Sequence, residues 1–206
     1  MTDHSAPHGH MAADWDARYS EESRIWSGNP NQALVAEVTG LTPGTALDVG
    51  CGEGADAIWL AQQGWQVTAL DPSSVALERA RAAAESAGVT IDFRHTGLTR
   101  MSQSFDLVSA FYPALPKVDD AMTDLLDAVA PGGTLLMVHH VEFDRDRALE
   151  HGFDPDDFVS VDEVAAAMES ASWQIVEHAV RNRDVREGAG AHHTQDLVLR
   201  ATRSRS

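Results

Sequence analysis

Hydrophobic and polar positions along this chain follow two kinds of pattern. Short apolar runs that predict buried strands lie at 45–49, 66–70, 90–94, 105–110, 134–138, near 173–181 and near 194–201. Between most of these runs the apolar residues recur at helical spacing, most clearly at Met122, Leu125, Leu126 and Val129. Alternating strands and helices predict an α/β fold with a mostly parallel, seven-stranded sheet. No helix separates the last two runs, which are therefore expected to pair as an antiparallel hairpin.

Capping residues predict where several of the helices begin and end. The pair Asn29-Pro30 is expected to start one helix, with Asn as the cap and Pro at the first helical position. Ser73 or Ser74 is expected to cap a long alanine-rich helix that ends at Gly88. The Pro-Gly-Gly sequence at 131–133 is expected to break the following helix before the fifth strand.

The chain shows no internal repeat and no linker that would mark a second domain. Residues 1–10 (MTDHSAPHGH) lack apolar periodicity and are expected to form a mobile tail, whose histidines either bind a metal ion loosely or are incidental. Residues 11–206 are expected to fold as a single domain. Within it, residues 11–40 supply N-terminal helices and residues 141–160 form an insert.

The acidic composition argues against one class of partner. The chain carries a formal net charge of −17 and one lysine, Lys117, and its arginines are scattered among acidic residues. Nucleic acids and anionic membranes require clustered cationic side chains, so no nucleic acid and no membrane is expected as a partner. The single cysteine, Cys51, forms no intramolecular disulfide, and no apolar run approaches the ~20 residues of a membrane span. These observations predict a cytoplasmic protein.

The sequence ALDVGCGEGADAIWLA at 46–61 predicts a glycine-rich turn between a strand and a helix. Because Gly50, Gly52 and Gly54 carry no side chain, a nucleotide-bearing ligand can approach the backbone closely. A phosphate-binding loop of the NTPase type is excluded, because no Gly-Lys-Ser/Thr follows. The run 50–55 satisfies the GxGxxA pattern of dinucleotide-binding folds, which leaves a nicotinamide cofactor open.

Acidic residues around this turn favour a different ligand. Glu53 lies within the turn, where its charge would repel a pyrophosphate, and Asp48 precedes the turn. Asp71 ends the second predicted strand, 21 residues after Gly50, where a carboxylate can accept both hydroxyls of a ribose. The pattern fits a cationic or zwitterionic adenosine compound without phosphate, such as S-adenosylmethionine.

In these motifs the chain resembles the class I S-adenosylmethionine-dependent methyltransferases over roughly residues 11–202. LDVGCGEG and VTALDPS resemble the first two motifs of that family, and FDLVSAFYPAL and AVAPGGTLLMV resemble the fourth and fifth. WDARYSEESRIWSGNPN resembles the N-terminal lid of small-molecule members, including the tellurite-resistance and thiopurine types. The resemblance implies a doubly wound, Rossmann-like sheet, S-adenosyl-L-methionine as cofactor and a small-molecule acceptor, in a monomer or homodimer.

The resemblance also implies which residues contact the cofactor. The glycine turn would line the methionine portion, Asp71 would hold the ribose, the loop after the third strand would border the base, and the lid would close over the ligand. The cofactor-binding candidates are Arg18, Tyr19, Trp26, Asp48, Gly50, Cys51, Gly52, Gly54, Asp71, Pro72, Gly97, Leu98, Ala110 and Phe111. Packing within the domain explains the spacing of Trp15 and Tyr19 equally well. Many relatives carry an acid for the adenine amine where this chain has HTGL at 95–98.

Candidate catalytic residues follow from the expected topology. His139 and His140 end the fifth predicted strand and His193 precedes the last one, so antiparallel pairing of these strands would bring them together near Tyr112. Neutral imidazoles there would take a proton from a thiol or phenol near neutral pH, or bind a metal or metalloid. Local hydrogen bonds that cap the strand ends are the alternative. Cys51 is expected to be a small packed residue, because methyl transfer needs no enzyme thiol.

The sequence therefore predicts in-line transfer of a methyl group from S-adenosylmethionine to a small molecule. The accepting group is a thiol, a hydroxyl, an amine or a metalloid, and the insert 141–160 is expected to cover it. Two other interpretations stay open: a non-catalytic cofactor-binding sensor and a nicotinamide-dependent oxidoreductase. No bound metal is expected as part of the machinery.

Overall fold

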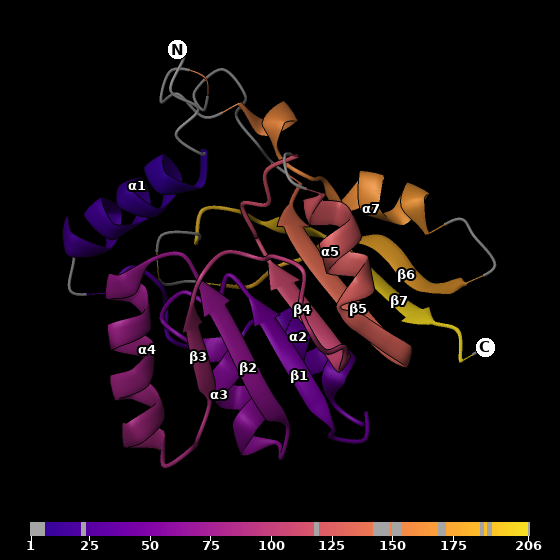
Figure 1. The fold of residues 1–206 in the computed structure, drawn as a ribbon, viewed down its shortest axis with the longest axis horizontal. Coiled ribbons are helices and arrows are strands. Elements are labelled where there is room, and N and C mark those ends of the chain that lie inside the picture. The colour runs from indigo at the N-terminus through magenta and orange to yellow at the C-terminus, as the bar shows by residue number, and fades with distance from the viewer. Residues whose placement is uncertain are drawn as a thin grey trace.

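The computed structural model describes residues 7–21, 24–117, 120–141, 149, 154–168, 172–185, 188 and 191–205. At its centre is a seven-stranded sheet in the order β3-β2-β1-β4-β5-β7-β6, with helices on both faces (Figure 1). The strands are β1 Thr45–Val49, β2 Gln66–Asp71, β3 Asp92–His95, β4 Phe105–Phe111, β5 Val129–His140, β6 Trp173–Asn182 and β7 Gln195–Arg203.

The pairing directions confirm the predicted fold class. Strands β1 to β5 pair in parallel, whereas β7 runs antiparallel to both β5 and β6. The chain therefore has the expected doubly wound, Rossmann-like sheet with a C-terminal antiparallel hairpin. Because β1 lies between β2 and β4, the strand order reverses at this point, and folds of this type bind ligands beyond the carboxyl ends of such strands.

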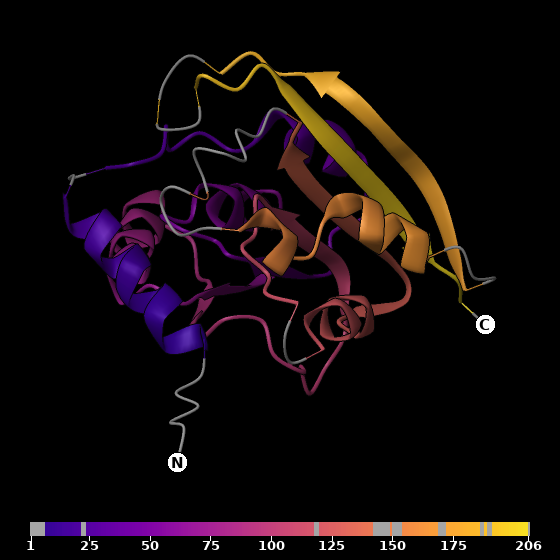
Figure 2. The ribbon, with the colours of Figure 1, turned by 90° about the horizontal axis from the view of Figure 1, so that it is seen from above.

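The helices are α1 Pro7–Glu21, α2 Gln32–Val38, α3 Ala55–Gln62, α4 Ser74–Ala87, α5 Ala121–Asp127 and α7 Val161–Ala167, with a 3-10 turn, η1, at Pro155–Asp157. Helices α2 and α3 pack on one face of the sheet, and α5 and α7 pack on the other. Helix α1 contacts α4 and lies on the side toward which the arrows of β1, β2 and β4 point (Figures 1 and 2). Within the described residues, no helix is both long enough and apolar enough to span a membrane.

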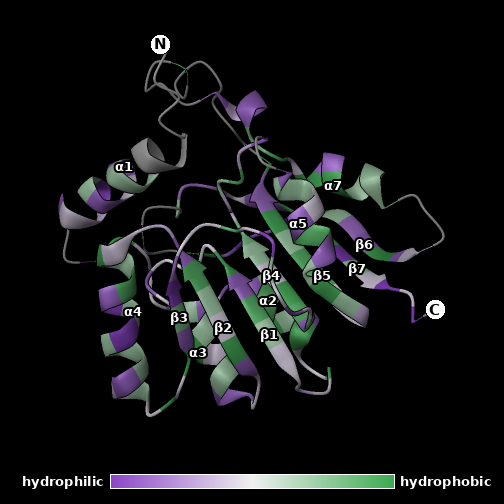
Figure 3. Cartoon of the chain, in the orientation of Figure 1, coloured by the Kyte–Doolittle hydropathy of each residue, from purple (hydrophilic) through white to green (hydrophobic). Residues whose placement is uncertain are grey.

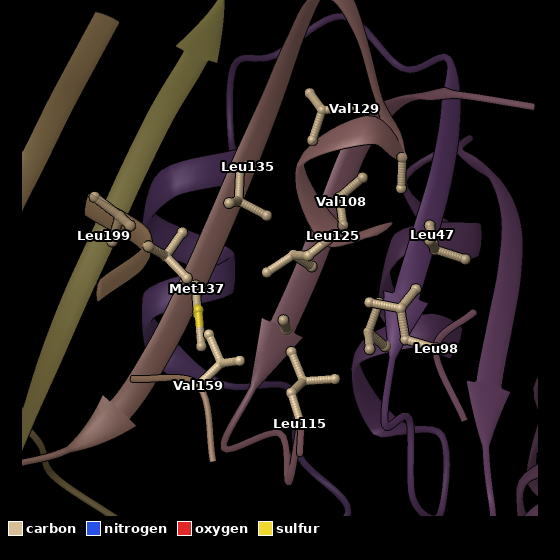
Figure 4. Packing of buried hydrophobic residues seen from close by; sticks show 14 of the residues in the cluster. Leu47, Leu98, Val108, Leu115, Leu125, Val129, Leu135, Met137, Val159 and Leu199 are labelled. Atoms are coloured by element: carbon tan, nitrogen blue, oxygen red, sulfur yellow. The ribbon is translucent and has the colours of Figure 1, made fainter. Parts of the chain in front are cut away.

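Two apolar layers cover the sheet, and apolar residues are concentrated along its strands (Figure 3). On one side, Leu125 of α5 packs with Leu135 of β5, and both side chains are fully buried (Figure 4). On the other side, Leu34 of α2 and Leu60 of α3 pack with Leu136 of β5. Neighbouring residues of β5 thus face opposite layers, as the alternation of a strand requires.

The start of α2 differs from the sequence prediction. The helix begins at Gln32 and not at Pro30. The reason is that Asn31 donates two hydrogen bonds to Asp56. Its backbone N–H and its side-chain amide each reach one carboxyl oxygen, at a distance of 2.7 Å. Asn31 is held extended by this contact, and its side chain is not available to cap the helix.

Two other boundaries also differ. Val129 was expected to complete a helix, but it pairs with Phe105 as the first residue of β5. Helix α1 begins at Pro7, so residues 7–10 of the expected mobile tail are helical, while residues 1–6 lie outside the described part of the chain. Of the predicted insert 141–160, only 141, 149 and 154–160 are described.

Candidate functional site

A cavity of about 1740 Å³ lies over the carboxyl edge of the parallel strands. Its walls come from α1, the segment 24–31, the turn after β1, the loop after β3 and the ends of β4, β5 and β7. With one exception, the sequence-predicted residues line this cavity: Arg18, Tyr19, Trp26, Asp48, Gly50, Cys51, Gly52, Gly54, Asp71, Pro72, Gly97, Leu98, Phe111, Tyr112, His139, His140 and His193.

Ala110 is the exception among the predicted residues. Its side chain is fully buried in the core layer that contains Val108, while the next residue, Phe111, reaches the cavity. Alternation along β4 explains the difference, because successive side chains point to opposite faces of the sheet. The side chain of Ala110 therefore does not line the cavity, and a contact between this residue and the cofactor stays a prediction.

The turn after β1 needs glycine at all three positions. Gly50, Gly52 and Gly54 have φ angles of 74°, 53° and 85°, a region that other residues rarely adopt. A Cβ on Gly54 would also lie 2.9 Å from the Cβ of Ala80, so glycine allows α3 to pack closely on α4. Backbone conformation and packing thus account for the three alternating glycines.

The backbone amides of this turn are already engaged within the protein. Gly50 and Cys51 both donate to the carbonyl of Leu70 at 2.9 Å. Gly52 donates to Asp71 Oδ2 at 2.8 Å, and Gly54 donates to the carbonyl of Cys51 at 2.9 Å. A pyrophosphate at a dinucleotide turn relies on such amides, so this turn is poorly suited to bind one.

Glu53 has a different role from the one expected. Its carboxylate pairs with the guanidinium of Arg79 on α4 at 2.8 Å and accepts the backbone N–H groups of Ile25 and Trp26. Arg79 also donates to the carbonyl of Tyr19. Because its charge is offset by Arg79, Glu53 does not supply the predicted repulsion of a pyrophosphate; it anchors the segment 24–26 to the turn.

Asp48 lies beneath the turn and is 2% exposed. Its Oδ1 accepts the Ser109 hydroxyl at 3.0 Å, whereas its Oδ2 has no hydrogen-bond partner among the described residues. Burial raises the pKa of Asp48, the nearby Asp56 raises it further, and the Ala57 amide opposes the shift. An unpartnered buried oxygen is costly, and a cationic donor would satisfy it. The site therefore fits a ligand that carries an ammonium group.

Asp71 closes the opposite side of the turn. Its Oδ2 accepts the Gly52 amide and its Oδ1 accepts the Ser73 amide, each at 2.8 Å. Burial raises the pKa of Asp71. Each carboxylate oxygen has two lone pairs, so both oxygens keep one acceptor position for the predicted ribose hydroxyls.

Cys51 is a partly buried thiol near these two acids. Burial raises the pKa of Cys51 well above its ordinary value, and the proximity of Asp48 and Asp71 raises it further. The protonated thiol is a poor nucleophile. This agrees with the expectation that Cys51 is a packed residue with no covalent role.

Helix α1 and the segment that follows it close one side of the cavity. Tyr19 is 3% exposed, and its hydroxyl accepts the indole N–H of Trp26 at 2.9 Å. Both side chains touch the turn, because a Cβ on Gly52 would lie 2.9 Å from Tyr19 Oη and 3.4 Å from Trp26 Nε1. Arg18 places its guanidinium over Trp15 and Trp26, 5.1 and 5.5 Å from the ring centroids. These residues both pack within the domain and line the cavity.

Asp16 fastens α1 to the start of α4. Its carboxylate accepts the hydroxyls of Ser73 at 2.6 Å and of Ser74 at 3.1 Å. The hydrogen bond from Ser73 lowers the pKa of Asp16, so this acid stays ionised. No sequence motif pointed to Asp16, because its partners lie more than fifty residues further along the chain.

Replacing Glu53 by glutamine is expected to loosen the segment 24–26. The variant loses the charge that holds Arg79 and becomes a weaker acceptor for the amides of Ile25 and Trp26. Hydrogen exchange at these two amides should accelerate about 10-fold, which corresponds to about 1.4 kcal/mol. The control is Asp92→Asn, which removes an exposed ion pair with Arg94. Equal exchange in both variants would contradict the anchoring role.

The four ring residues that the sequence places together divide into two groups. Tyr112, His140 and His193 form a stack, with ring centroids 4.0 Å apart for Tyr112–His140 and 3.8 Å apart for His140–His193. His139 belongs to the other face of β5, and its Nε2 lies 3.2 Å from the carbonyl of Pro113. Only the edge of its ring contacts Tyr112, at a centroid distance of 6.3 Å.

Asp196 of β7 is hydrogen-bonded to two members of this stack, and no sequence pattern points to it. It lies directly opposite His140 in the β5–β7 pairing and is 7% exposed. Its Oδ1 lies 2.8 Å from His140 Nδ1, and its Oδ2 accepts the Tyr112 hydroxyl at 2.8 Å. Arg183 Nε lies 3.4 Å from the same Oδ2. Only the register of the last strand, which the sequence does not give, reveals this contact.

Tyr112 is held as a neutral phenol. Burial raises the pKa of Tyr112, and the negative charge of Asp196 raises it further. Its backbone also adopts a left-handed conformation, with φ of 52°. Tyr112 therefore suits a role in holding neighbouring groups better than a role as a base. No group of His, Cys, Asp and Glu among the described residues has the arrangement of a metal site.

Parts of this chain are similar in sequence to known methyltransferases. A family model described as a methyltransferase domain matches residues 46–133. The ubiquinone biosynthesis O-methyltransferase of Pseudomonas paraeruginosa is 31% identical over 135 residues, which cover 62% of this chain and 58% of that protein. The chain thus spans less than two thirds of the length of the first curated relatives that it matches.

Solved structures extend the likeness across the whole sheet. One, from a study of the conversion of a disulfide bond into a thioacetal group during echinomycin biosynthesis, has a TM-score of 0.71 at 27% identity and covers 96% of this chain and 93% of its own. A methyltransferase from Thiobacillus denitrificans in complex with S-adenosyl-L-homocysteine has a TM-score of 0.63 at 18% identity, with 92% and 98% covered.

The fold and the site define a Rossmann-like α/β protein whose glycine turn suits a cationic adenosine compound. The two solved structures align with 96% and 92% of this chain, so the likeness includes both the parallel strands and the terminal hairpin. Residues 46–133 match a methyltransferase domain, and the chain shares its fold with solved S-adenosylmethionine-dependent methyltransferases.

Proposed function

We propose that this chain transfers a methyl group from S-adenosyl-L-methionine to an oxygen or sulfur atom of a small molecule. The observation that carries the proposal is the buried carboxyl group of Asp48. Its Oδ2 has no hydrogen-bond partner among the described residues, and the amides of the turn above it already donate to protein oxygens. This arrangement suits a cationic cofactor and offers little to a pyrophosphate. When bound, S-adenosylmethionine supplies a methyl group that its sulfonium already activates.

Residues of the chain would hold the cofactor at three points. Asp48 would meet the ammonium group, and Asp71 would accept the ribose hydroxyls. Tyr19 and Trp26 would exclude water on the side of the lid, because their hydrogen-bonded pair already covers the turn. The positioning of the acceptor in line with the methyl group is then the main task of the site.

The acceptor would occupy the part of the cavity near His139 and His140. A cavity of about 1740 Å³ exceeds the roughly 300–1,000 Å³ of a pocket for one drug-sized ligand, so it has room for both cofactor and acceptor. A hydroxyl or thiol loses a proton as its oxygen or sulfur forms the new bond, and an imidazole can receive that proton. The curated relatives named for ubiquinone biosynthesis are O-methyltransferases, which favours a hydroxyl.

Calorimetry followed by turnover assays tests the proposal. S-adenosylhomocysteine is expected to bind at least about 100-fold more tightly than NADH, a difference of about 2.8 kcal/mol. With S-adenosylmethionine and a panel of phenols, catechols and thiols, at least one acceptor should release S-adenosylhomocysteine. Preferential binding of NADH would overturn the proposal in favour of an oxidoreductase. Tight binding of S-adenosylhomocysteine without turnover of any acceptor would favour the non-catalytic sensor.

A further inference from the structure

We propose that Asp196 is a positioning residue that makes His140, and not His139, the proton acceptor of the reaction. The inference rests on the proposed function and concerns which ring takes the proton. Asp196 is absent from the residues that line the cavity, whereas His139 and His140 both line it. Asp196 therefore acts through His140 rather than on the acceptor.

The contact with Asp196 determines which nitrogen of His140 carries the proton. A carboxylate only accepts hydrogen bonds, so His140 Nδ1, at 2.8 Å from Asp196 Oδ1, is the donor. The neutral ring then has its lone pair on Nε2. Because His140 lines the cavity, Nε2 is the nitrogen that can accept a proton from a bound hydroxyl or thiol.

The same contact stabilises the imidazolium that forms when Nε2 takes the proton. The side chains of His140 and Asp196 are 16% and 10% exposed, so water screens their attraction only weakly. A buried aspartate that holds a histidine tautomer and stabilises its charged form is the orienting arrangement of catalytic triads. Asp196 is itself fixed, because its other oxygen receives the Tyr112 hydroxyl and faces Arg183 Nε.

Stacking fixes the plane of the His140 ring. Its interplanar angles are 25° with Tyr112 and 16° with His193. The guanidinium of Arg183 lies over the Tyr112 ring, 5.4 Å from its centroid. These contacts leave His140 little freedom to rotate, so its Nε2 is presented in one direction.

His139 lacks these supports. Its Nε2 faces the carbonyl of Pro113, which accepts a hydrogen bond and so keeps the proton on that nitrogen. Burial lowers the pKa of His139, and the neighbouring His140 lowers it further, although the Pro113 carbonyl opposes the shift. A charged His139 is therefore disfavoured where a charged His140 is paired with a carboxylate.

The proton transfer balances without another reactant. As the acceptor oxygen or sulfur forms its bond to the methyl carbon, its proton passes to His140 Nε2. The bond between the methyl carbon and the cofactor sulfur breaks, and its electron pair stays on that sulfur. The charged His140 then releases its proton to water after the product has left.

The tautomer of His140 is directly measurable by nuclear magnetic resonance of the ¹⁵N-labelled protein. At a pH where the ring is neutral, His140 is expected as the Nδ1–H form. In Asp196→Asn the donors Tyr112 and Arg183 should keep an oxygen on their side, so the amide NH₂ faces His140 and converts it to the Nε2–H form. The control is Asp162→Asn, which removes the partner of His178 on the surface.

Acceptors of different acidity provide the second measurement. Asp196→Asn and His140→Ala are expected to lower kcat about 100-fold with an un-ionised phenol, the scale of general base catalysis. With a nitrophenol that is already ionised the loss should be at most a few-fold, because no proton remains to be moved. A merely structural role would lower both rates equally.

The outcomes separate this inference from the proposed function. An Nε2–H tautomer of His140 in the unsubstituted protein would overturn the inference, and this measurement requires neither a variant nor an acceptor. Equal losses with the two phenols, or a larger loss in His139→Ala than in His140→Ala, would also overturn it. Failure to bind S-adenosylhomocysteine would instead count against the proposed function and leaves the tautomer measurement valid.

Discussion

Replacing Gly52 by alanine is expected to raise the dissociation constant for S-adenosylhomocysteine about 100-fold, or about 2.8 kcal/mol. Gly52 has φ of 53°, and a Cβ there would lie 2.9 Å from Tyr19 Oη and 3.4 Å from Trp26 Nε1. The added methyl group must displace this hydrogen-bonded pair from the turn. The substitution therefore disturbs both the glycine turn and the Tyr19–Trp26 pair that covers it.

Gly40→Ala is the matched control for backbone strain. Gly40 also has a positive φ, of 94°, but no atom lies within 4 Å of a Cβ built there. It is absent from the residues that line the cavity. Calorimetry on both variants should show weak binding for Gly52→Ala and nearly unchanged binding for Gly40→Ala. Equal affinities would contradict the placement of the cofactor at the turn.

Leu135→Ala is expected to lower the free energy of unfolding by about 2–5 kcal/mol. Leu135 lies on the inner strand β5 and is fully buried, in the same cluster as Leu125 and Leu199 (Figure 4). Truncation removes apolar contacts and leaves a space that strands fixed on both sides cannot easily fill. Unfolding in urea, monitored by circular dichroism without ligand, measures the loss.

Val176→Ala provides the comparison on the surface. Val176 is 52% exposed on the edge strand β6, so its truncation should change the free energy of unfolding by no more than about 0.5 kcal/mol. A loss below about 1 kcal/mol in Leu135→Ala would show that the layer between the sheet and α5 is less tightly packed than its burial indicates.

The strands of the sheet were predictable from short apolar runs because the inner strands are buried on both faces, whereas the doubly wound arrangement came from the family resemblance. The run 135–138 is continuously apolar, which is the pattern that a strand between two helical layers requires. The errors arose where tertiary contacts overrule local preference. Val129 continues a helical spacing but pairs with Phe105, and Asn31 bonds to Asp56 instead of capping a helix.

The glycine turn of the candidate site was easier to predict from the sequence than the residues near His139 and His140. The glycine turn on the cofactor side is encoded in one continuous segment, so a local motif located Asp48 and the glycines. The acceptor side depends on which residues of β5 and β7 lie opposite each other. A register is set by the whole sheet, so the sequence pointed to His139 and His140 together but not to their opposite faces or to Asp196.

The contacts that hold the lid against the rest of the domain also could not be predicted from the sequence, because they join residues far apart in the chain. The resemblance of WDARYSEESRIWSGNPN to the N-terminal lid of small-molecule methyltransferases is what points to Tyr19 and Trp26. The roles of Asp16, Glu53 and Arg79 in holding the lid were not predictable, because charged residues are usually solvated and no sequence pattern identifies their partners. Packing of α1 on α4 is what brings them together.

The insertion of β7 between β5 and β6 has a consequence for the growing polypeptide on the ribosome. Strand β6 is synthesised before β7, and β7 is its only neighbour among the described strands of the sheet, so β6 has no strand to pair with until the later segment emerges. Asp196 arrives with that segment. The described hydrogen-bond partners of the residues in the glycine turn all precede residue 110, whereas the orientation of His140 requires Asp196 and therefore the last strand of the chain.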